Sequence, residues 1–193
     1  MKQSSTLGCV IMASGQGRRF GGNKLMAPFW GEPMIARILR ATEGIFSSRV
    51  VVTCHEDVAA FARGRGTDVI LHSLPYRSDT VRLGVEAMGQ DITGCVFCPG
   101  DQPLLTRQTL LALARAAEQT PDCFWQASGE AGVGMPVYFP GAWFPRLRAL
   151  PQGKGGNVLL KENPELVRFL PVPPRELQDV DTPEDLYRLQ REP

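Results

Sequence analysis

The chain has 193 residues, of which 43% are hydrophobic and 21% are charged, a size and composition typical of one globular domain with a real core and not of a disordered chain. Its 21 Lys and Arg residues nearly balance its 20 Asp and Glu residues, and the formal net charge is +1. This balance excludes a broad field for sequence-independent binding of nucleic acid or anionic membranes. The apolar runs are far shorter than the roughly 20 residues of a membrane span and lack the layout of a signal peptide. We therefore expect a cytoplasmic protein with a single domain of the size of a small enzyme over residues 1–193.

Short apolar, β-branched runs alternate along the chain with amphipathic stretches. The runs predict strands at residues 9–13, 50–53, 68–71, 95–98, 123–127, 137–139 and 167–172. Apolar residues at three- and four-residue spacing predict helices at residues 34–42, 57–63, 80–88, 106–119 and 184–191. This alternation indicates an α/β fold with a largely parallel sheet, helices on both faces and ligands at the carboxyl ends of the strands.

Glycine and proline interrupt the pattern in two places. After residue 128 they are expected to break up any long element before a last strand and helix. Residues 150–156 are expected to form an exposed, flexible loop. The cysteines are five, an odd number without short disulfide spacing, and Cys95 and Cys98 lie in a strand-like run. We interpret that pair as small buried hydrophobic residues and not as a redox or zinc motif.

The segment after the first expected strand, residues 13–24, reads ASGQGRRFGGNK. Its glycines allow the backbone N–H groups to approach a ligand closely. It fails as a dinucleotide fingerprint, because Phe20 stands at the third glycine, and as a Walker A loop, because Leu25 follows the lysine in place of Ser or Thr. What remains is a phosphate-binding turn of another kind, in which Arg18, Arg19 and Lys24 supply charge. The alternative is a basic surface loop with incidental glycines.

Acidic residues follow the fourth expected strand and precede the last helix. Asp101 comes at the carboxyl end of the strand, in a turn rich in Gly and Pro. Mg²⁺ prefers one or two protein carboxylates, with waters and substrate phosphates as its other ligands. Asp179-Val-Asp181 supplies further acids near the C-terminus, and of these two we expect Asp181 to share a site with Asp101. Residues 182–185 are explained as a helix start, with Thr182 as N-cap. For Asp179 and Asp181, the alternative is that they are solvated acids ahead of a helix.

The order and spacing of these motifs resemble the nucleotidyltransferases that act on molybdopterin, most closely the molybdenum cofactor cytidylyltransferases. The opening motif of that family is matched by Ala13, Ser14, Gly15, Arg19, Gly21 and Lys24. Its Gly-Asp-x-Pro metal motif is matched by residues 100–103, and its Asp-Thr-Pro-Glu-Asp-Leu ending by residues 181–186. The likeness implies a three-layer α/β/α, Rossmann-like fold of the nucleotide-diphospho-sugar transferase (GT-A-like) type, with a mostly parallel mixed sheet.

The resemblance also implies an activity, which is transfer of CMP from CTP to the terminal phosphate of molybdopterin with release of pyrophosphate and Mg²⁺ as cofactor. The sister guanylyltransferases typically carry Gly-Gly in place of Ser14-Gly15, and Asn where Asp179 and Asp181 stand here, so both differences favour cytidine. A molybdoenzyme or its maturation chaperone is the expected transient partner, and neither nucleic acid nor a membrane is expected. The alternatives are a guanylyltransferase using GTP, a sugar- or alditol-phosphate nucleotidyltransferase, and a noncatalytic nucleotide-binding or maturation protein.

The same likeness assigns roles to individual residues. The implied catalytic residues are Arg19, Lys24 and Asp101, and the implied metal ligands are Asp101 and Asp181. Nucleotide contacts are expected from Ala13, Ser14, Gly15, Gly17, Arg19, Lys24, Ser78, Thr80, Arg82, Pro99 and Gly100. Acceptor contacts are expected from Gln102, Gly134, Met135, Lys154 and Asp179.

Other residues receive weaker or no roles. Residues 76–82, 134–136 and 153–156 depart from the commoner family pattern and are expected to face the pterin. Helix capping by Ser78 or Asp79 explains the first of these segments equally well. No further ligands cluster in sequence around His55 or His72, so we expect no metal role for either histidine.

Overall fold

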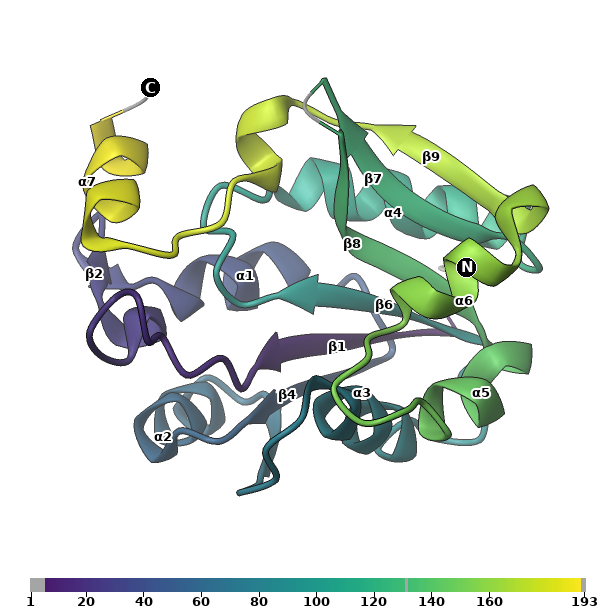
Figure 1. Cartoon of the computed structure of the whole chain (residues 1–193), viewed down its shortest axis with the longest axis horizontal. Coiled ribbons are helices and arrows are strands. Elements are labelled where there is room, and N and C mark those ends of the chain that lie inside the picture. The colour runs from purple at the N-terminus through teal and green to yellow at the C-terminus, as the bar shows by residue number, and fades with distance from the viewer. Residues whose placement is uncertain (1–5, 131, 192–193) are drawn as a thin grey trace.

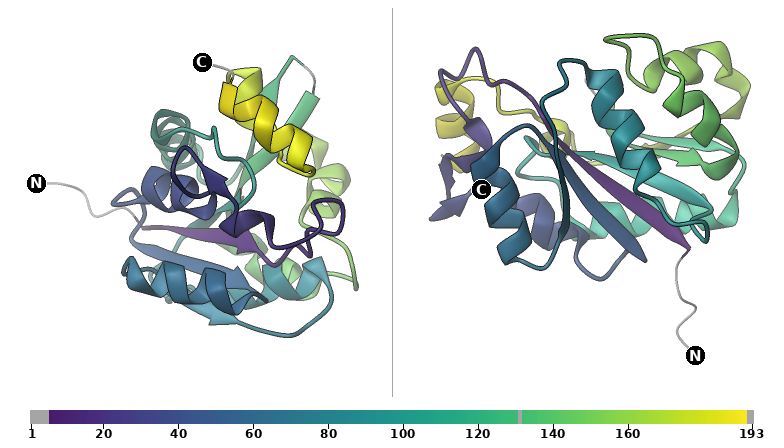
Figure 2. Two further views of the ribbon diagram at one scale, coloured as in Figure 1. Left: turned by 90° about the vertical axis from the view of Figure 1, so that its left-hand side faces the viewer. Right: turned by 90° about the horizontal axis from the view of Figure 1, so that it is seen from below.

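The computed structural model describes residues 6–130 and 132–191 as a seven-stranded sheet with helices packed on both faces (Figures 1 and 2). The sheet strands are β1 (Leu7–Ala13), β4 (Ser48–Thr53), β5 (Asp68–Leu71), β6 (Gly94–Pro99), β7 (Phe124–Gly129), β8 (Gly132–Pro140) and β9 (Val167–Pro171). The helices are α1 (Ile35–Thr42), α2 (Glu56–Gly64), α3 (Arg77–Glu86), α4 (Arg107–Gln119), α5 (Phe144–Arg148), α6 (Asn157–Glu162) and α7 (Pro183–Arg191). Every strand and helix predicted from the sequence is present, with bounds shifted by at most three residues except at β8, which starts five residues before the predicted strand.

The two faces of the sheet bury separate cores. Cys9 and Ile11 of β1 point into a cluster with α1, α2, α4 and α7, whereas Val10 points into a second cluster with α3, α5 and α6. This is the two-residue period of a strand covered on both sides. Cys95 and Cys98 are fully buried, and burial raises the pKa of both thiols well above the ordinary value. The interpretation of that pair as small hydrophobic residues is therefore confirmed.

The strand order β5-β4-β1-β6-β8-β7-β9 places a topological switch point at the centre of the sheet. From β1 the chain continues to β4 and β5 on one side, and it then crosses to β6 on the other side. The carboxyl ends of β1 and β6 therefore border the crevice in which sheets of this class bind ligands. Only β8 runs antiparallel to its neighbours among the described strands of this sheet, so the expected mostly parallel mixed sheet is confirmed.

The expectation that glycine and proline break up the region after residue 128 is wrong. β8 runs for 9 residues through it, because β6 and β7 pair with it on its two sides and supply backbone partners that the local sequence does not reveal. The short helices α5 and α6 were also missed, and they bury Leu147 and Leu159 against the second core. Residues 151–154 are exposed, as expected for that loop.

The N-terminal and C-terminal parts of the chain meet beside the sheet. A small hairpin of β2 (Pro28–Phe29) and β3 (Glu32–Pro33) lies next to α7 (Figure 1). The indole N–H of Trp30 donates to the carbonyl of Gln190 over 3.1 Å, and the Gln190 amide donates back to the carbonyl of Pro28 over 3.0 Å. Among the described residues, no helix is both long and apolar enough to cross a membrane.

Candidate active site

The glycine-rich loop leaves the carboxyl end of β1 and folds back on itself. Gly17 has a φ of +58°, and its carbonyl accepts hydrogen bonds from the N–H groups of Phe20 and Gly21 over 2.9 and 3.1 Å. The loop ends where the Asn23 side chain accepts from the N–H of Leu25 over 3.2 Å. This cap starts the short 3-10 helix η1 (Lys24–Met26) and directs Lys24 inward.

Replacing Gly17 with alanine is expected to destabilise the protein. A Cβ there would lie 2.1 Å from the carbonyl oxygen of Gly22, on a backbone in the left-handed region. The conformational strain alone costs about 1–2 kcal/mol, and the steric clash adds to it. Thermal unfolding of Gly17→Ala should show a lower midpoint than wild type. Gly15→Ala is the matched control, because nothing lies within 4 Å of its added Cβ; equal midpoints for the two variants would contradict this account of the loop.

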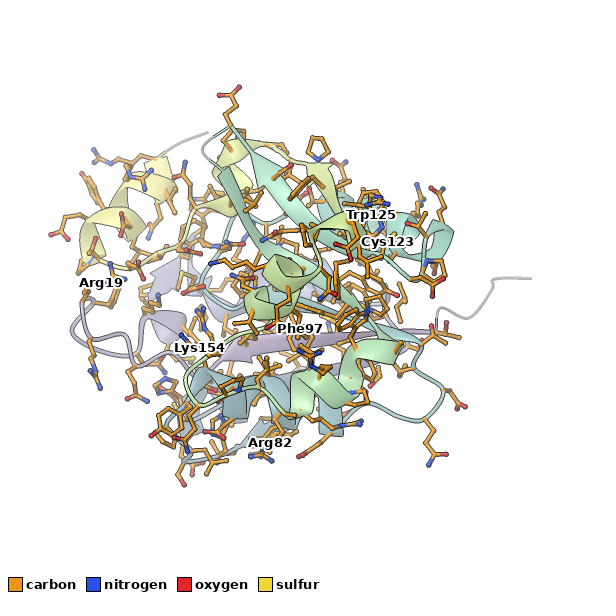
Figure 3. All side chains as sticks on the ribbon, turned by 45° about the vertical axis from the view of Figure 1, so that its right-hand side comes forward. Arg19, Arg82, Phe97, Cys123, Trp125 and Lys154 are labelled. Atoms are coloured by element: carbon orange, nitrogen blue, oxygen red, sulfur yellow. The ribbon has the colours of Figure 1, made fainter. Side chains whose placement is uncertain are left out.

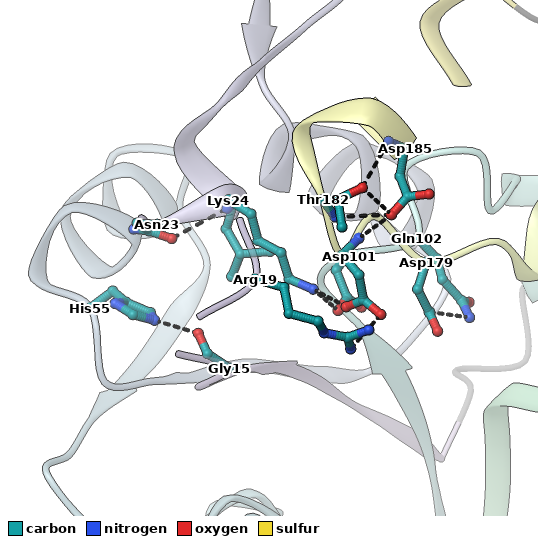
Figure 4. A network of polar contacts seen from close by, with 12 residues as sticks. Gly15, Arg19, Asn23, Lys24, His55, Asp101, Gln102, Asp179, Thr182 and Asp185 are labelled. Atoms are coloured by element: carbon teal, nitrogen blue, oxygen red, sulfur yellow. Dashed lines mark hydrogen bonds and ion pairs between the residues drawn. The ribbon is translucent and has the colours of Figure 1, made fainter. Parts of the chain in front are cut away.

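Three loops converge on a cluster of opposite charges above the switch point (Figure 4). The Lys24 ammonium donates to Oδ2 of Asp101 over 2.7 Å and to Oδ1 of Asp181 over 3.1 Å. Arg19 donates to Oδ2 of Asp181 over 2.7 Å. The two expected acids, 80 residues apart in the chain, thus share one ammonium group. Two positive and two negative charges meet at the point where β1 and β6 end.

Lys24 is the buried member of the cluster. Its side chain is 8% exposed, against 73% for Arg19. Burial is the largest single influence on the pKa of Lys24 and would lower it, but the carboxylates of Asp101 and Asp181 together outweigh burial and raise the pKa. Lys24 is therefore a charged ammonium at neutral pH, at the spot where the two carboxylates point.

The C-terminal segment is held against the Asp101 turn by its own backbone. The N–H of Val180 donates to the carbonyl of Asp101 over 2.9 Å, and the Gln102 amide donates to the carbonyl of Leu177 over 3.2 Å. Val180 is fully buried between the two acids. Of these acids, Asp181 pairs with Lys24 and Arg19, whereas Asp179 lines the cavity.

Asp179 receives a hydrogen bond from Gln102 over 3.0 Å instead. Burial, followed by repulsion from Asp101, raises the pKa of Asp179. Behind the pair, α7 begins with the expected cap, in which Thr182 and Asp185 exchange hydrogen bonds (Figure 4). Asp185 also accepts from the backbone N–H of Asp181 over 3.1 Å. The capping box thus fixes the direction in which the Asp181 side chain leaves the backbone.

A cavity of about 540 Å³ opens beside the cluster. It lies over the part of the sheet that β6, β7 and β8 form. Four of the five expected acceptor residues line it, namely Gln102, Gly134, Met135 and Asp179. Asp101 lines it as well and so belongs to both the cavity and the charged cluster. The fifth, Lys154, lies on the exposed loop beside Gly155, outside the cavity wall formed by the described residues.

The expected nucleotide contacts from residues 78–82 are not brought to the cluster. Ser78 is buried and accepts a hydrogen bond from the N–H of Gly153 over 3.3 Å. Thr80 is 3% exposed. Arg82 pairs with Glu86 over 3.2 Å, and Figure 3 shows it well separated from Arg19. The N-terminus of α3 is capped by Tyr76 and Asp79, which form a capping box. Of the two residues expected to cap this helix, Asp79 therefore contributes, from inside the first turn.

The remaining backbone residues expected at the nucleotide lie at the strand ends. Ala13 is buried as the last residue of β1, while Ser14 is half-buried and Gly15 exposed. Pro99 ends β6 and lines the cavity. The N–H of Gly100 donates to the carbonyl of Met12 over 3.0 Å, which ties the Asp101 turn to β1.

The donor set fits a hard divalent cation. Two carboxylates that both reach one ammonium nitrogen are close enough to share a cation, and oxygen ligands are what Mg²⁺ and Mn²⁺ prefer. Within the described residues no group of three or more His, Cys, Asp or Glu side chains could hold a metal. The protein would therefore offer Asp101 and Asp181 and leave the other positions to water and substrate phosphate.

Sequence reasoning missed several polar residues of the site. Gln126 of β7 and Asn157 of α6 line the cavity, and so does Arg77 at the start of α3. Gln126 is 7% exposed, and a glutamine inside an otherwise buried strand is a signal that could have identified it. His55 and His72 contact the N-terminal loop directly. No local pattern signals these two contacts, because each joins residues at least 40 positions apart.

Several known proteins are similar to this chain over nearly its whole length. The chain is 28% identical to the purine catabolism protein PucB of Bacillus subtilis (strain 168), over 94% of this chain and 95% of that protein. It is 26% identical to a molybdenum cofactor guanylyltransferase of Rhodobacter capsulatus, over 93% and 92% of the two chains. Rv0371c of Mycobacterium tuberculosis H37Rv superposes with a TM-score of 0.85 at 26% identity, covering 97% of this chain and 99% of that one. Rv0371c has also been crystallised as a complex with manganese.

Solved nucleotidyltransferase structures share the three-layer fold, which confirms the Rossmann-like architecture expected from the sequence. The family model described as the MobA-like NTP transferase domain matches residues 9–167, which include the N-terminal loop, Lys24 and Asp101. That match spans most of the chain, and the protein belongs to the family of MobA-like NTP transferases.

Proposed function

We propose that this nucleotidyltransferase transfers CMP from CTP to the phosphate of molybdopterin, giving molybdopterin cytosine dinucleotide and pyrophosphate. The observation that carries the proposal is the meeting of Lys24, Asp101 and Asp181 at the mouth of a cavity that Asp101 itself lines. A nucleoside triphosphate brings several negative charges, and the cluster offers cations to hold them. The cavity offers room for a second, larger substrate beside the same carboxylate.

The arrangement supports an in-line displacement at the α-phosphorus. An oxygen of the acceptor phosphate forms a bond to the α-phosphorus, the bond to the bridging oxygen breaks, and pyrophosphate leaves with that electron pair. The attacking oxygen is already anionic at neutral pH, so positioning and charge neutralisation suffice without a general base. Lys24 and Arg19 would hold the departing phosphates, and Asp101 stands between them and the cavity.

A divalent cation fits the same proposal. Mg²⁺, when bound, would neutralise charge on the phosphate oxygens. Asp101 and Asp181 are the residues that would hold it, since both point at the same place. The manganese complex of Rv0371c supports a divalent metal in this fold.

Two features support cytidine as the base and molybdopterin as the acceptor. The loop carries Ser14-Gly15 and the C-terminal segment carries Asp179 and Asp181, as the cytidylyltransferases that the chain resembles do. The cavity combines apolar walls such as Phe97 and Met135 with the amides of Gln102 and Gln126, which suits a flat heterocycle with polar edges. We further propose a cytoplasmic location and transfer of the product to a molybdoenzyme or its maturation chaperone.

The test is pyrophosphate release with Mg²⁺, CTP or GTP, and the molybdenum-loaded pterin as acceptor. We expect kcat/KM for CTP to exceed that for GTP at least tenfold, the change given by about 1.4 kcal/mol of discrimination. Faster release with GTP would make the protein a guanylyltransferase, as the name of its Rhodobacter capsulatus relative suggests. Release driven by a sugar or alditol phosphate, with none from the pterin, would replace the acceptor. No release with any acceptor would make the protein a noncatalytic binding protein.

A further inference from the structure

Both histidines of the chain contact the N-terminal loop, although neither takes part in the charged cluster. Three successive side chains at the end of β4 satisfy three successive carbonyls at the start of that loop. The hydroxyl of Thr53 donates to Ala13 over 2.9 Å, and the thiol of Cys54 donates to Ser14 over 3.3 Å. The Nε2 atom of His55 donates to the carbonyl of Gly15 over 2.8 Å (Figure 4). The loop is therefore held along its edge by β4.

His72, directly after β5, contacts the side chain of Ser14, and its partners fix its tautomer. The backbone N–H of Leu74 donates to Nδ1 of His72 over 3.1 Å. Because Nδ1 accepts, the proton of the neutral ring is on Nε2. Nε2 lies 2.8 Å from the hydroxyl oxygen of Ser14 and must donate to it.

The hydroxyl of Ser14 has a second partner that leads to the same assignment. It lies 3.1 Å from the carbonyl oxygen of Val52, which can only accept, so Ser14 donates there. A hydroxyl has one proton and two lone pairs. The proton is used by Val52 and one lone pair by His72, which leaves one lone pair. Toward any further partner Ser14 can act only as a hydrogen-bond acceptor.

The proposed function places the nucleoside on this side of the sheet. The cavity for the acceptor lies over β6, β7 and β8, and the phosphates lie at Lys24 beside Asp101. In an in-line attack the acceptor oxygen and the departing pyrophosphate lie on opposite sides of the α-phosphorus, and the nucleoside extends from it in a third direction. With the acceptor in the cavity and the pyrophosphate at Lys24, that direction is over the other half of the sheet, formed by β1, β4 and β5, where Ser14 and His72 lie.

We propose that His72 is a positioning residue that fixes the Ser14 hydroxyl as an acceptor for an exocyclic amino group of the nucleobase, so that the site selects cytosine over uracil. Cytosine and uracil differ at C4, where cytosine presents an amino donor and uracil a carbonyl acceptor. The C4 carbonyl of uracil would face the remaining lone pair of Ser14, so neither acceptor would have a donor. Leaving both polar groups unpaired lowers the affinity for uracil. The inference rests on the proposed function and names how its base would be chosen.

The protonation state of His72 supports this arrangement. Burial, the largest influence, lowers the pKa of His72; Asp79 raises it and Arg82 lowers it further. A second proton would sit on Nδ1 and point at the N–H of Leu74. The arrangement is therefore present at neutral pH, where the ring is uncharged, and is lost as the pH falls through a pKa that lies below the usual value.

The test compares binding of CTP and UTP by calorimetry in wild type and in variants of the two residues. We expect wild type to bind CTP about tenfold more tightly than UTP, the effect of roughly one hydrogen bond lost and one polar group left unpaired. Ser14→Ala and His72→Leu should each remove most of that ratio, and the double variant should lose no more than Ser14→Ala alone. His72→Gln should restore the ratio, since its amide can donate to Ser14 and accept from Leu74.

The matched control is His55→Gln, because the His55 side chain contacts the backbone carbonyl of Gly15 and not the hydroxyl of Ser14. It should change the affinities for CTP and UTP by the same factor. In wild type the ratio of the affinities for CTP and UTP should also fall as the pH is lowered from about 7 to about 5. In His72→Gln this ratio should not change with pH. Protonation of the phosphates affects both nucleotides alike and so leaves the ratio unchanged.

Each failure has its own signature. An unchanged ratio in Ser14→Ala and His72→Leu would overturn the inference and leave the cytidylyltransferase proposal intact. Wild type that binds CTP and UTP equally would do the same. Wild type that binds neither pyrimidine nucleotide but binds GTP would overturn the proposed base, and the inference with it. If His72→Leu fails to fold, Ser14→Ala and His72→Gln still decide the outcome.

Discussion

Lys24→Ala is expected to lower kcat for pyrophosphate release by about 10² or more, the loss typical when one charged group that stabilises a transition state is removed. Lys24 is buried and lies between two carboxylates. Without it, no ammonium balances Asp101 and Asp181 where the triphosphate must approach, and the departing pyrophosphate loses a cation. Initial rates of pyrophosphate release from CTP at saturating Mg²⁺ and pterin measure the effect.

The control for this variant is Lys161→Ala, an exposed lysine on α6. It removes the same charge from the protein without touching the cluster and should keep wild-type turnover. Lys24→Arg is informative as well, because a planar guanidinium cannot reproduce the point contact of an ammonium with two carboxylates. Wild-type kcat in Lys24→Ala, with a native circular dichroism spectrum, would remove Lys24 from the mechanism.

Asp101→Asn is expected to lower kcat/KM by about 10²–10³ and to weaken binding of Mn²⁺ in the presence of CTP. The amide has nearly the shape of the carboxylate but not its charge. The fold should survive, because the bond from the N–H of Val180 goes to the backbone carbonyl of Asp101 and not to the side chain. Electron paramagnetic resonance of Mn²⁺ measures the metal separately from catalysis.

Asp91→Asn makes the same chemical change at an exposed position before β6 and should affect neither quantity. If Asp101→Asn binds Mn²⁺ and CTP as wild type does, the carboxylate is not a metal ligand. If Asp101→Asn also keeps normal turnover, catalysis does not need the Asp101 carboxylate, and the charged cluster has only a structural role.

The sequence predicted those parts of the site that follow from local chemistry. Asp101 was found because a buried strand must end in a turn, and the Gly and Pro around it mark that turn. The cap of α7 was found from the pattern of Thr182 and Asp185. In each case the cause lies within a few residues of its effect.

The parts that could not be predicted depend on distant contacts. β8 forms through its glycines because two strands flank it. Ser78 and Thr80 were expected near the nucleotide, yet α3 turns both into the interior of the protein. The role of His72 depends on Ser14, which lies 58 positions earlier and two strands away. Periodicity and motifs contain no information on such pairs.

The pairing of Val180 with Asp101 has a consequence for how the protein acquires activity during synthesis. The two carboxylates come together only when the segment before α7 has left the ribosome, since Asp181 is encoded 80 codons after Asp101. A nascent chain that stops at residue 167, where the family match ends, holds Lys24 and one acid but lacks the other. Catalytic competence would thus arrive late in translation, after the sheet has been largely built.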